Sequence, residues 1–294
     1  MSADGRFAPS PTGTLHVGNL RTALLAWLFA RSRGARFLVR MEDLDSGRVR
    51  PGAAHQQLAD LAAIGLDWDG DVVQQSARLD RYAHAIAALD AAGQLYECFC
   101  TRAEIRAAAS APHGPLPEGA YPGTCLRLTD AERAGHRASG RRPALRVRAG
   151  AAHLGFEDRL LGRVEGVVDD FVVRRNDGAP AYNLAVVVDD AAQGVGEVVR
   201  GDDLADTTPR QLLLARLLGL PEPAYAHVPL VLGPDGARLA KRHGGVTLRE
   251  LDAAAALRWM ASSLGLPPAS DPRTLVAAFD PARIPRDPAV WEGR

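Results

Sequence analysis

The sequence has few cysteines, no net charge and no long apolar run, and each absence excludes a class of protein. Its 294 residues include three cysteines, an odd number that argues against a disulfide framework. Lys+Arg and Asp+Glu are 35 each, so any contact with RNA must use a local patch. No apolar stretch reaches transmembrane length, and no signal peptide precedes the first predicted strand. We therefore expect a cytoplasmic protein with no membrane partner.

The phosphate-binding motif G-x-x-x-x-G-K-[ST] is also absent. What stands near the N-terminus instead is G-R-F-A-P-S-P-T-G-T-L-H-V-G-N-L-R at 5–21, which predicts a strand over 6–8, a proline-stiffened loop and a helix beginning near His16. The unpaired N–H groups at a helix N-terminus form an anion site. Gly18 would let a phosphate approach the backbone, and His16 could donate to a phosphoryl oxygen.

The rest of the chain alternates between helical and strand patterns, which favours an α/β fold. A strand over 36–41 completes a β-α-β unit, and helices are predicted from residue 51 to 65, over 78–92, after Thr101 and Thr129, from Pro209 to 219 and over 248–264. Further strands are predicted over 95–100, 144–148, 155–159, 163–175, 180–188, 195–199 and 227–232. N-D-G at 176–178 predicts a hairpin turn.

The motif H-V-G-N at 16–19, with R-F-A-P-S-P-T-G before it, resembles the HIGH signature of class I aminoacyl-tRNA synthetases of the glutamyl and glutaminyl branch. The resemblance runs from Arg6 to about Leu266. It implies a Rossmann-like catalytic domain, with a parallel sheet flanked by helices and an inserted zinc-containing α+β subdomain. We assign the two catalytic halves to 1–95 and 190–245, the zinc-binding insert to 96–189, and a short helical C-terminal extension to 246–294.

Several predicted strands end in polar residues, at the edge where open α/β sheets bind ligands. Glu42 suits a substrate ammonium group, and Arg200 suits a carboxylate, although an ion pair with a neighbouring aspartate would also explain it. Tyr182 is expected at the mouth of the strand over 180–188, as a pocket residue or a half-buried aromatic. The resemblance implies a glutamate site formed by Arg6, Phe7, Ala8, Pro9, Ser10, Glu42, Tyr182 and Arg200.

A basic loop, R-L-A-K-R at 238–242, resembles the second signature of the same synthetases, K-M-S-K-S. Lys241 matches its second lysine, whereas Arg238 and Ala240 replace its first lysine and serine. The resemblance implies that His16 and Lys241 are catalytic residues on the phosphates of ATP. It also implies that the ATP-binding residues are His16, Gly18, Asn19 and Lys241. Magnesium is expected with ATP, although no protein ligand for it is evident.

All three cysteines fall between 98 and 125, as C-x-C followed after 24 residues by the third. Two thiolates one residue apart with a distant third suit a structural, tetrahedral zinc ion; three buried thiols are the alternative. His113 is the candidate fourth ligand on ordinary ligand chemistry. Similarity to truncated paralogues of the family favours a tyrosine instead, so we expect zinc to be held by Cys98, Cys100, Tyr121 and Cys125.

Only about fifty residues follow Lys241, too few for an anticodon-binding domain. The sequence therefore resembles the truncated glutamyl-queuosine tRNA(Asp) synthetases. That resemblance implies ATP-dependent, tRNA-independent activation of L-glutamate, its transfer to the queuosine base of tRNA(Asp), and a monomer. Three alternatives are a split glutamyl-tRNA synthetase that charges the tRNA 3′ end, a non-catalytic module binding RNA or a partner, and a nucleotidyltransferase acting on another small acid.

Overall fold

The computed structural model describes residues 4–109 and 120–293. Within them, a seven-stranded sheet has the order β3-β2-β1-β9-β10-β6-β7, with neighbours parallel except for the antiparallel pair β6–β7. Its strands are β1 (Gly5–Phe7), β2 (Phe37–Met41), β3 (Val73–Gln74), β6 (His153–Asp158), β7 (Gly162–Val167), β9 (Glu197–Gly201) and β10 (Ala224–Val228). The predicted α/β fold with a mostly parallel sheet is confirmed.

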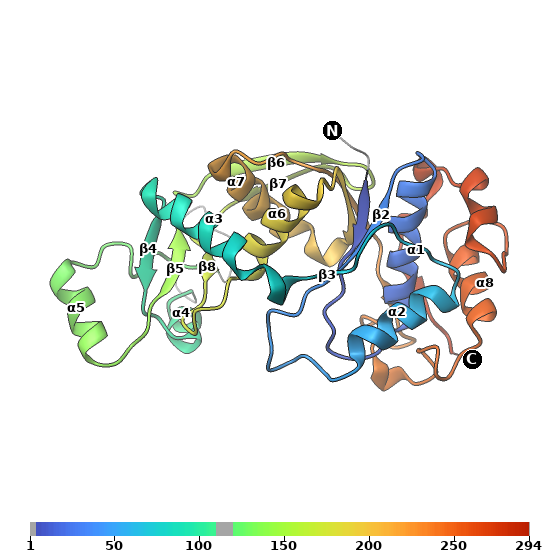
Figure 1. Cartoon of the computed structure of the whole chain (residues 1–294), viewed down its shortest axis with the longest axis horizontal. Coiled ribbons are helices and arrows are strands. Elements are labelled where there is room, and N and C mark those ends of the chain that lie inside the picture. The colour runs from blue at the N-terminus through green and yellow to red at the C-terminus, as the bar shows by residue number, and fades with distance from the viewer. Residues whose placement is uncertain (1–3, 110–119, 294) are drawn as a thin grey trace.

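Eight α-helices lie in the described part of the chain. They are α1 (Val17–Arg31), α2 (Ala53–Ala63), α3 (Leu79–Ala91), α4 (Arg102–Ala109), α5 (Asp130–Ala138), α6 (Tyr182–Gln193), α7 (Thr208–Leu218) and α8 (Ala253–Ser263). The molecule is elongated, with α4 and α5 near one end, α1, α2 and α8 at the other, and α3, α6 and α7 between them (Figure 1). None of these helices is both long and apolar enough to cross a membrane.

The central pair of strands, β1 and β9, forms the point at which the strand order reverses. From β1 the chain moves outward to β2 on one side, whereas β9 leads to β10 on the other. The crevice at the carboxyl ends of such a pair is the usual ligand site of an open α/β sheet. The loop after β1, the residue after β2 and the last residues of β9 therefore meet at this edge.

The two faces of the sheet differ in chemistry. Because side chains alternate along a strand, one face carries apolar residues such as Val39, Val199 and Ala226, which pack with α1 in the largest core cluster. The other face carries buried charged or polar side chains, one from each central strand: Arg6, Arg40, Arg200 and His227. Helix α6 supplies Asp189 and Asp190 to this second face.

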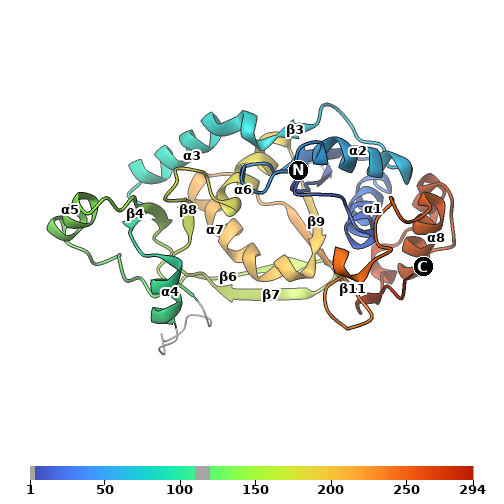
Figure 2. The same cartoon turned by 90° about the horizontal axis from the view of Figure 1, so that it is seen from below.

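A second, antiparallel sheet lies at the far end of the molecule, beside α5 (Figure 1). It consists of β4 (Leu95–Cys98), β5 (Ala144–Val147) and β8 (Val172–Arg174), in the order β4-β5-β8. The hairpin of β6 and β7 runs along the molecule beneath α6 and α7 (Figure 2) and joins the main sheet through β10. The division into catalytic halves, insert and extension stays a prediction.

The C-terminal segment packs against the α1 side of the main sheet. After α8 the chain forms three short elements, the 3-10 turns Pro272–Ala278 and Pro281–Arg283 and the strand β12 (Ala289–Val290), which pairs with β11 (Val231–Leu232). Leu275, Phe279, Ile284 and Trp291 are buried in the core cluster that contains α1.

The strand predicted over 180–188 is wrong: residues 182–188 belong to helix α6, and Ala181 is its N-cap. The run L-A-V-V-V has the branched side chains typical of strands, but a short apolar run has the same pattern in a helix buried on several sides. Leu184, Ala185, Val186 and Val187 are all buried. Gly194, in the left-handed conformation, ends the helix. The predicted turn at 176–178 is present, but the strand beyond it is reduced to a single bridge, Arg174–Pro180.

Three other predicted elements differ in their bounds. The predicted strand over 163–175 is divided into β7 and β8, which lie in different sheets. The predicted helix over 248–264 begins only at Ala253, because Thr247 and Glu250 close a separate turn and Asp252 caps α8 by accepting from Ala255 N at 2.8 Å. The predicted strand over 227–232 is divided into the end of β10 and β11. Pro229 lies at the break, where it has no N–H to donate to a ladder.

Candidate functional site

A cavity of about 630 Å³ opens at the carboxyl ends of β1, β2 and β9. Its walls contain every residue predicted to bind glutamate and three of the four predicted to bind ATP: Arg6, Phe7, Ala8, Pro9, Ser10, His16, Gly18, Asn19, Glu42, Tyr182 and Arg200. Lys241 begins the 3-10 turn Lys241–His243, and its side chain lies outside the described residues. The structure thus brings together residues that are up to 194 positions apart in the sequence.

His16 caps the N-terminus of α1 through a reciprocal pair of hydrogen bonds with Asn19. Asn19 N donates to His16 Nδ1 at 3.3 Å, and His16 N donates to Asn19 Oδ1 at 3.2 Å. Since Nδ1 accepts, the proton of the neutral imidazole is on Nε2. A Cβ on Gly18 would lie 3.0 Å from His16 Nδ1 and 3.2 Å from Val231 Cβ. Glycine at this position therefore leaves room for the His16 ring at the helix N-terminus.

Arg6 is held by a carboxylate that the sequence analysis did not single out. Its Nε and Nη2 donate to the two oxygens of Asp190, each at 3.3 Å, and Nη1 donates to Val199 O at 3.4 Å. Asp190 also accepts from Arg40 Nη1 at 2.7 Å. Burial opposes ionisation of Asp190, but the guanidinium groups of Arg6 and Arg40 outweigh it and hold the pKa of Asp190 below its usual range.

The neighbouring carboxylate, Asp189, is the centre of a second set of contacts. It is fully buried and accepts from Gln75 Nε2 at 2.9 Å, Arg78 Nε at 2.6 Å and Tyr82 Oη at 2.7 Å. Arg40 Nε lies 3.8 Å from it. Asp189 thereby joins α3 and the turn before it to the charged face of the sheet.

Glu42 lies at the cavity, beside the guanidinium of Arg40, whose Nη2 is 3.2 Å from Glu42 Oε1. Burial raises the pKa of Glu42, and the positive charges of Arg40 and Arg6 offset only part of that rise. A substrate ammonium group at this position would favour the ionised carboxylate. The site can therefore gain free energy from binding an amine, which is what the sequence predicted of Glu42.

Arg200 is buried on the same face, and most of its donors are already occupied. Its Nε donates to His227 Nε2 at 3.0 Å, Nη1 to Gln211 Oε1 at 2.9 Å, and Nη2 to Thr208 Oγ1 at 2.8 Å and Leu204 O at 3.5 Å. Among the described residues these bonds use four of its five N–H donors. One Nη1 donor and the long bond to Leu204 remain available for a carboxylate in the cavity.

The two remaining predicted features of the cavity wall are Tyr182 and the basic loop. Tyr182 is 41% exposed and is the first residue of α6, so it reaches the cavity from a helix N-terminus rather than from a strand. Arg238, in the basic loop, forms an ion pair with Asp203, just beyond β9. Among the described residues, Arg200 forms no ion pair with a neighbouring aspartate, which was the alternative explanation for this arginine. Asp203 pairs with Arg238 instead.

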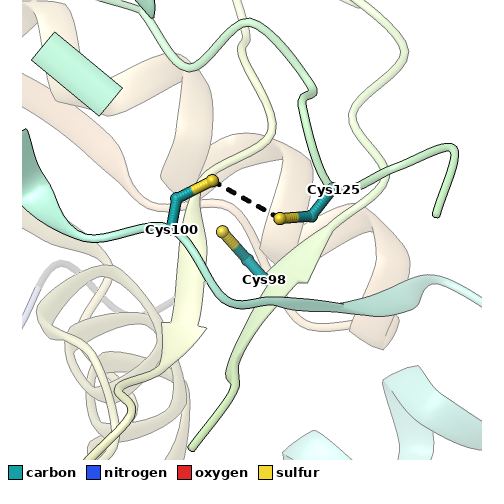
Figure 3. Close-up of side chains that lie close together, drawn as sticks. All are labelled: Cys98, Cys100 and Cys125. Atoms are coloured by element: carbon teal, nitrogen blue, oxygen red, sulfur yellow. Dashed lines mark hydrogen bonds between the residues drawn. The ribbon is translucent and has the colours of Figure 1, made fainter. Parts of the chain in front are cut away.

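The three cysteines lie together at the base of the three-stranded sheet, and their sulfur atoms point toward one another (Figure 3). All three sulfurs lie within 4.8 Å of one another, and Cys100 Sγ is 3.4 Å from Cys125 Sγ. Thiolates at about 2.3 Å from a zinc ion would be separated by similar distances. The cluster can hold a metal ion, as the sequence predicted.

Tyr121 is directed into the cysteine cluster. Its hydroxyl lies 3.4 Å from Cys98 Sγ and 3.7 Å from Cys100 Sγ, and accepts from Cys125 N at 2.8 Å. Burial and the neighbouring thiols raise the pKa of Cys100 to about 12, because thiolates so close together would repel one another. A bound cation would remove that repulsion. The guanidinium of Arg146 lies 3.7 Å from the centre of the Tyr121 ring and would offset negative charge in the cluster. His113, the competing candidate, lies outside the described residues.

Comparison with known proteins agrees with this fold. Residues 3–262 match the family model of class I tRNA synthetases (E and Q), catalytic domain. The chain is 65% identical over 291 residues to the glutamyl-Q tRNA(Asp) synthetase of Nocardia farcinica, covering 97% of this chain and 92% of the relative. It is 51% identical over 304 residues to the protein of that name from Symbiobacterium thermophilum, covering 97% and 94%. The chain therefore belongs to the glutamyl-Q tRNA(Asp) synthetase family of the class I synthetases.

Solved structures show the same catalytic architecture in longer proteins. The glutamate-tRNA synthetase of Elizabethkingia anophelis superposes with a TM-score of 0.86 at 25% identity, covering 99% of this chain and 68% of its own. The glutamate tRNA ligase of Elizabethkingia meningosepticum, in complex with its amino acid, gives a TM-score of 0.84 at 26% identity, covering 100% and 68%.

Proposed function

We propose that the chain activates L-glutamate with ATP and transfers the glutamyl group to the queuosine base of tRNA(Asp). The observation that carries this proposal is the 65% identity, over nearly the whole chain, to a protein named glutamyl-Q tRNA(Asp) synthetase. The cavity supports it, because the carboxyl group of Glu42 and the guanidinium group of Arg200 line one space beside the N-terminus of α1. An amino acid with a side-chain carboxylate needs that pair of charges.

Activation joins glutamate to the nucleotide. An oxygen of the α-carboxylate attacks the α-phosphorus of ATP, a P–O bond forms, and the bond to pyrophosphate breaks. In this proposal His16 donates from Nε2 to a phosphoryl oxygen, and Lys241 supplies positive charge as the leaving group departs. Gly18 and Asn19 lie against the nucleotide. Magnesium bound to the phosphates would neutralise part of their charge.

Transfer completes the reaction. A hydroxyl of queuosine attacks the acyl carbon of glutamyl-adenylate, a C–O ester bond forms, the bond to AMP breaks, and the hydroxyl proton is released with AMP or to solvent. Glutamate is held by contacts away from its reacting carboxylate, from Arg6, Ser10, Glu42, Tyr182 and Arg200. Because these contacts do not change as the acyl group is transferred, the same cavity serves both steps.

The metal of the cysteine cluster is zinc in this proposal, held by Cys98, Cys100, Tyr121 and Cys125. Four protein donors leave no open position, so the ion is structural and stabilises the fold of a segment whose local core is small. A monomer in the cytoplasm also remains part of the proposal.

The test is ATP–pyrophosphate exchange with each amino acid in the absence of tRNA, followed by transfer of labelled glutamate to tRNA(Asp) with and without queuosine. Exchange with glutamate alone, and label only on the queuosine-containing tRNA, would support the proposal. Exchange that requires tRNA, with label at the 3′ end, would instead favour a glutamyl-tRNA synthetase. No exchange under any condition would favour a binding module.

A further inference from the structure

A buried chain of hydrogen bonds runs from Arg200 to a carboxylate on the β6–β7 hairpin. Arg200 Nε donates to His227 Nε2 at 3.0 Å. The other ring nitrogen, His227 Nδ1, lies 2.6 Å from Asp158 Oδ2. His227 is fully buried and Asp158 is 5% exposed, so water competes little for these contacts.

The geometry fixes the protonation state of His227. A guanidinium can only donate, so Nε2 of the imidazole must accept. Thr208 Oγ1, 3.2 Å from the same Nε2, accepts from Arg200 Nη2 and can donate to the ring. The ring proton is therefore on Nδ1, where it is donated to Asp158. A protonated His227 would place an N–H against the N–H of Arg200.

The groups that face His227 from the other elements agree with a neutral ring. Tyr225 stacks on it with ring centres 5.9 Å apart, and Phe156 lies at the same distance. Asp202 is a more distant carboxylate that favours the charged ring. Burial and the positive charge of Arg200, however, together lower the pKa of His227 more than the carboxylates raise it.

We propose that His227 is a positioning residue for glutamate specificity: Asp158 fixes its Nδ1–H tautomer, and its Nε2 holds the guanidinium of Arg200 in the orientation that receives the substrate's side-chain carboxylate. This proposal rests on the proposed function, which assigns that carboxylate to Arg200. It also gives the β6–β7 hairpin a role in the site, although Asp158 does not line the cavity.

Asp158 is suited to this role because the fold holds it from several sides. Its Oδ1 accepts from Leu160 N at 2.9 Å and Leu161 N at 3.0 Å in the turn of the hairpin. Its Oδ2 accepts from His227 N at 3.1 Å as well as from the ring. An asparagine could keep the turn contacts through Oδ1, but its amide N–H would face the Nδ1–H of His227 and favour the opposite tautomer. The same carboxylate-to-amide change has that effect in a catalytic triad.

The first test is independent of catalysis: the ¹⁵N shifts of the His227 ring in the uniformly labelled full chain, assigned by the signal lost in His227→Gln. We expect a neutral Nδ1–H ring from pH 5.5 to 8, and a switch toward Nε2–H in Asp158→Asn. An Nε2–H ring in the unmodified chain, or titration near the ordinary value of about 6.5, would overturn the proposal whatever the enzyme's substrate.

The second test is the kinetics of glutamate-dependent pyrophosphate exchange. We expect His227→Phe and Asp158→Asn to raise the KM for glutamate by roughly 10- to 100-fold. A change of this size corresponds to the loss of one hydrogen bond to a charged group. The kcat and the KM for ATP should stay within about threefold, because the contact is remote from the reacting atoms. His227→Gln, which keeps an acceptor near Nε2, should recover part of the loss.

The matched control is Asp280→Asn, since Asp280 also caps a turn, accepting from Ala282 N at 2.9 Å, but is exposed and lies on the C-terminal segment. Its KM for glutamate should be unchanged. Equal losses in the KM values for glutamate and ATP, or a lower kcat with unchanged KM, would show a merely structural role and overturn the proposal. If the unmodified chain shows no exchange with glutamate, the proposed function fails instead. The ¹⁵N shifts of the His227 ring then still test whether the hydrogen bonds from Arg200 through His227 to Asp158 exist as described.

Discussion

Asp190→Asn should both destabilise the protein and weaken glutamate binding. The charged face beneath α6 holds three guanidinium groups and three carboxylates in mutual contact: Arg6, Arg40 and Arg78 with Glu42, Asp189 and Asp190. Their formal charges sum to zero. The substitution keeps the side chain's shape but leaves one positive charge without a counterpart.

The size of the effect follows from burial. The side chains of Arg6, Arg40 and Asp190 are 5%, 0% and 7% exposed. Breaking a pair buried in this way costs about 3–5 kcal/mol, and the retained amide oxygen places Asp190→Asn at the lower end. A loss of about 3 kcal/mol corresponds to a fall in Tm of roughly 5 °C in a chain of this size. Arg6, which lines the cavity, would lose its bidentate contact with the Asp190 carboxylate, so the KM for glutamate should rise as well.

The assay is calorimetric unfolding at pH 7 together with glutamate-dependent exchange, with Asp130→Asn as the matched control. Asp130 has a fully exposed side chain in an i,i+3 ion pair with Arg133. Asp130→Asn should therefore change the free energy of unfolding by no more than about 0.5 kcal/mol. The pKa of Asp190 is lowered in the folded state, so its stabilisation is present above the unfolded pKa of about 3.9 and is lost as pH falls through the folded value. A Tm and KM equal to those of the unmodified chain would refute the reasoning.

Three further predictions follow from the site. Because the pKa of Glu42 is raised, the KM for glutamate should increase on acidification at a pH above about 4.3, the pKa of an ordinary glutamate side chain. Glu42→Gln should raise the KM for glutamate at pH 7 and remove this pH dependence. A KM that does not change with pH in the unmodified chain would contradict the role of Glu42. Gly18→Ala should lower the kcat of exchange at least tenfold by displacing the His16 ring, with little change in the KM for glutamate; unchanged kcat would count against His16. Protein purified without chelator should contain one zinc per chain by mass spectrometry of the metal, lost in Cys98→Ser; metal-free protein would disprove the zinc site.

The helix caps and the cysteine site show what local sequence predicts well. The helices predicted after Thr101 and Thr129 are present, and each begins with reciprocal bonds between the threonine and a glutamate three positions on, Glu104 or Glu132, because a capping box depends only on residues three positions apart. The cysteines were predicted to lie together because all three fall in one short segment of sequence.

The buried charges beneath α6 could not be predicted in the same way. Arg40 lies within an apolar strand pattern, and its partner Asp190 is 150 positions away. Asp158 and His227 are 69 positions apart, and nothing near either one indicates the other. The error at 180–188 has a related cause, because the burial that makes the apolar run a helix is supplied by distant segments. Asp189 and Asp190, in the last two turns of this helix, were visible in the sequence, but they followed a predicted strand, and nothing indicated that they lie on a helix over the charged face.

Tryptophans and tyrosines lie in different parts of the molecule, so their fluorescence reports on different regions. All four tryptophans, Trp27, Trp68, Trp259 and Trp291, belong to or pack against the core cluster around α1. All five tyrosines, Tyr82, Tyr96, Tyr121, Tyr182 and Tyr225, lie outside that cluster. Fluorescence excited at wavelengths that tyrosine does not absorb therefore reports on the α1 end of the chain and is silent about the cysteine end, so a melting curve recorded that way would miss any earlier loss of structure around the metal site.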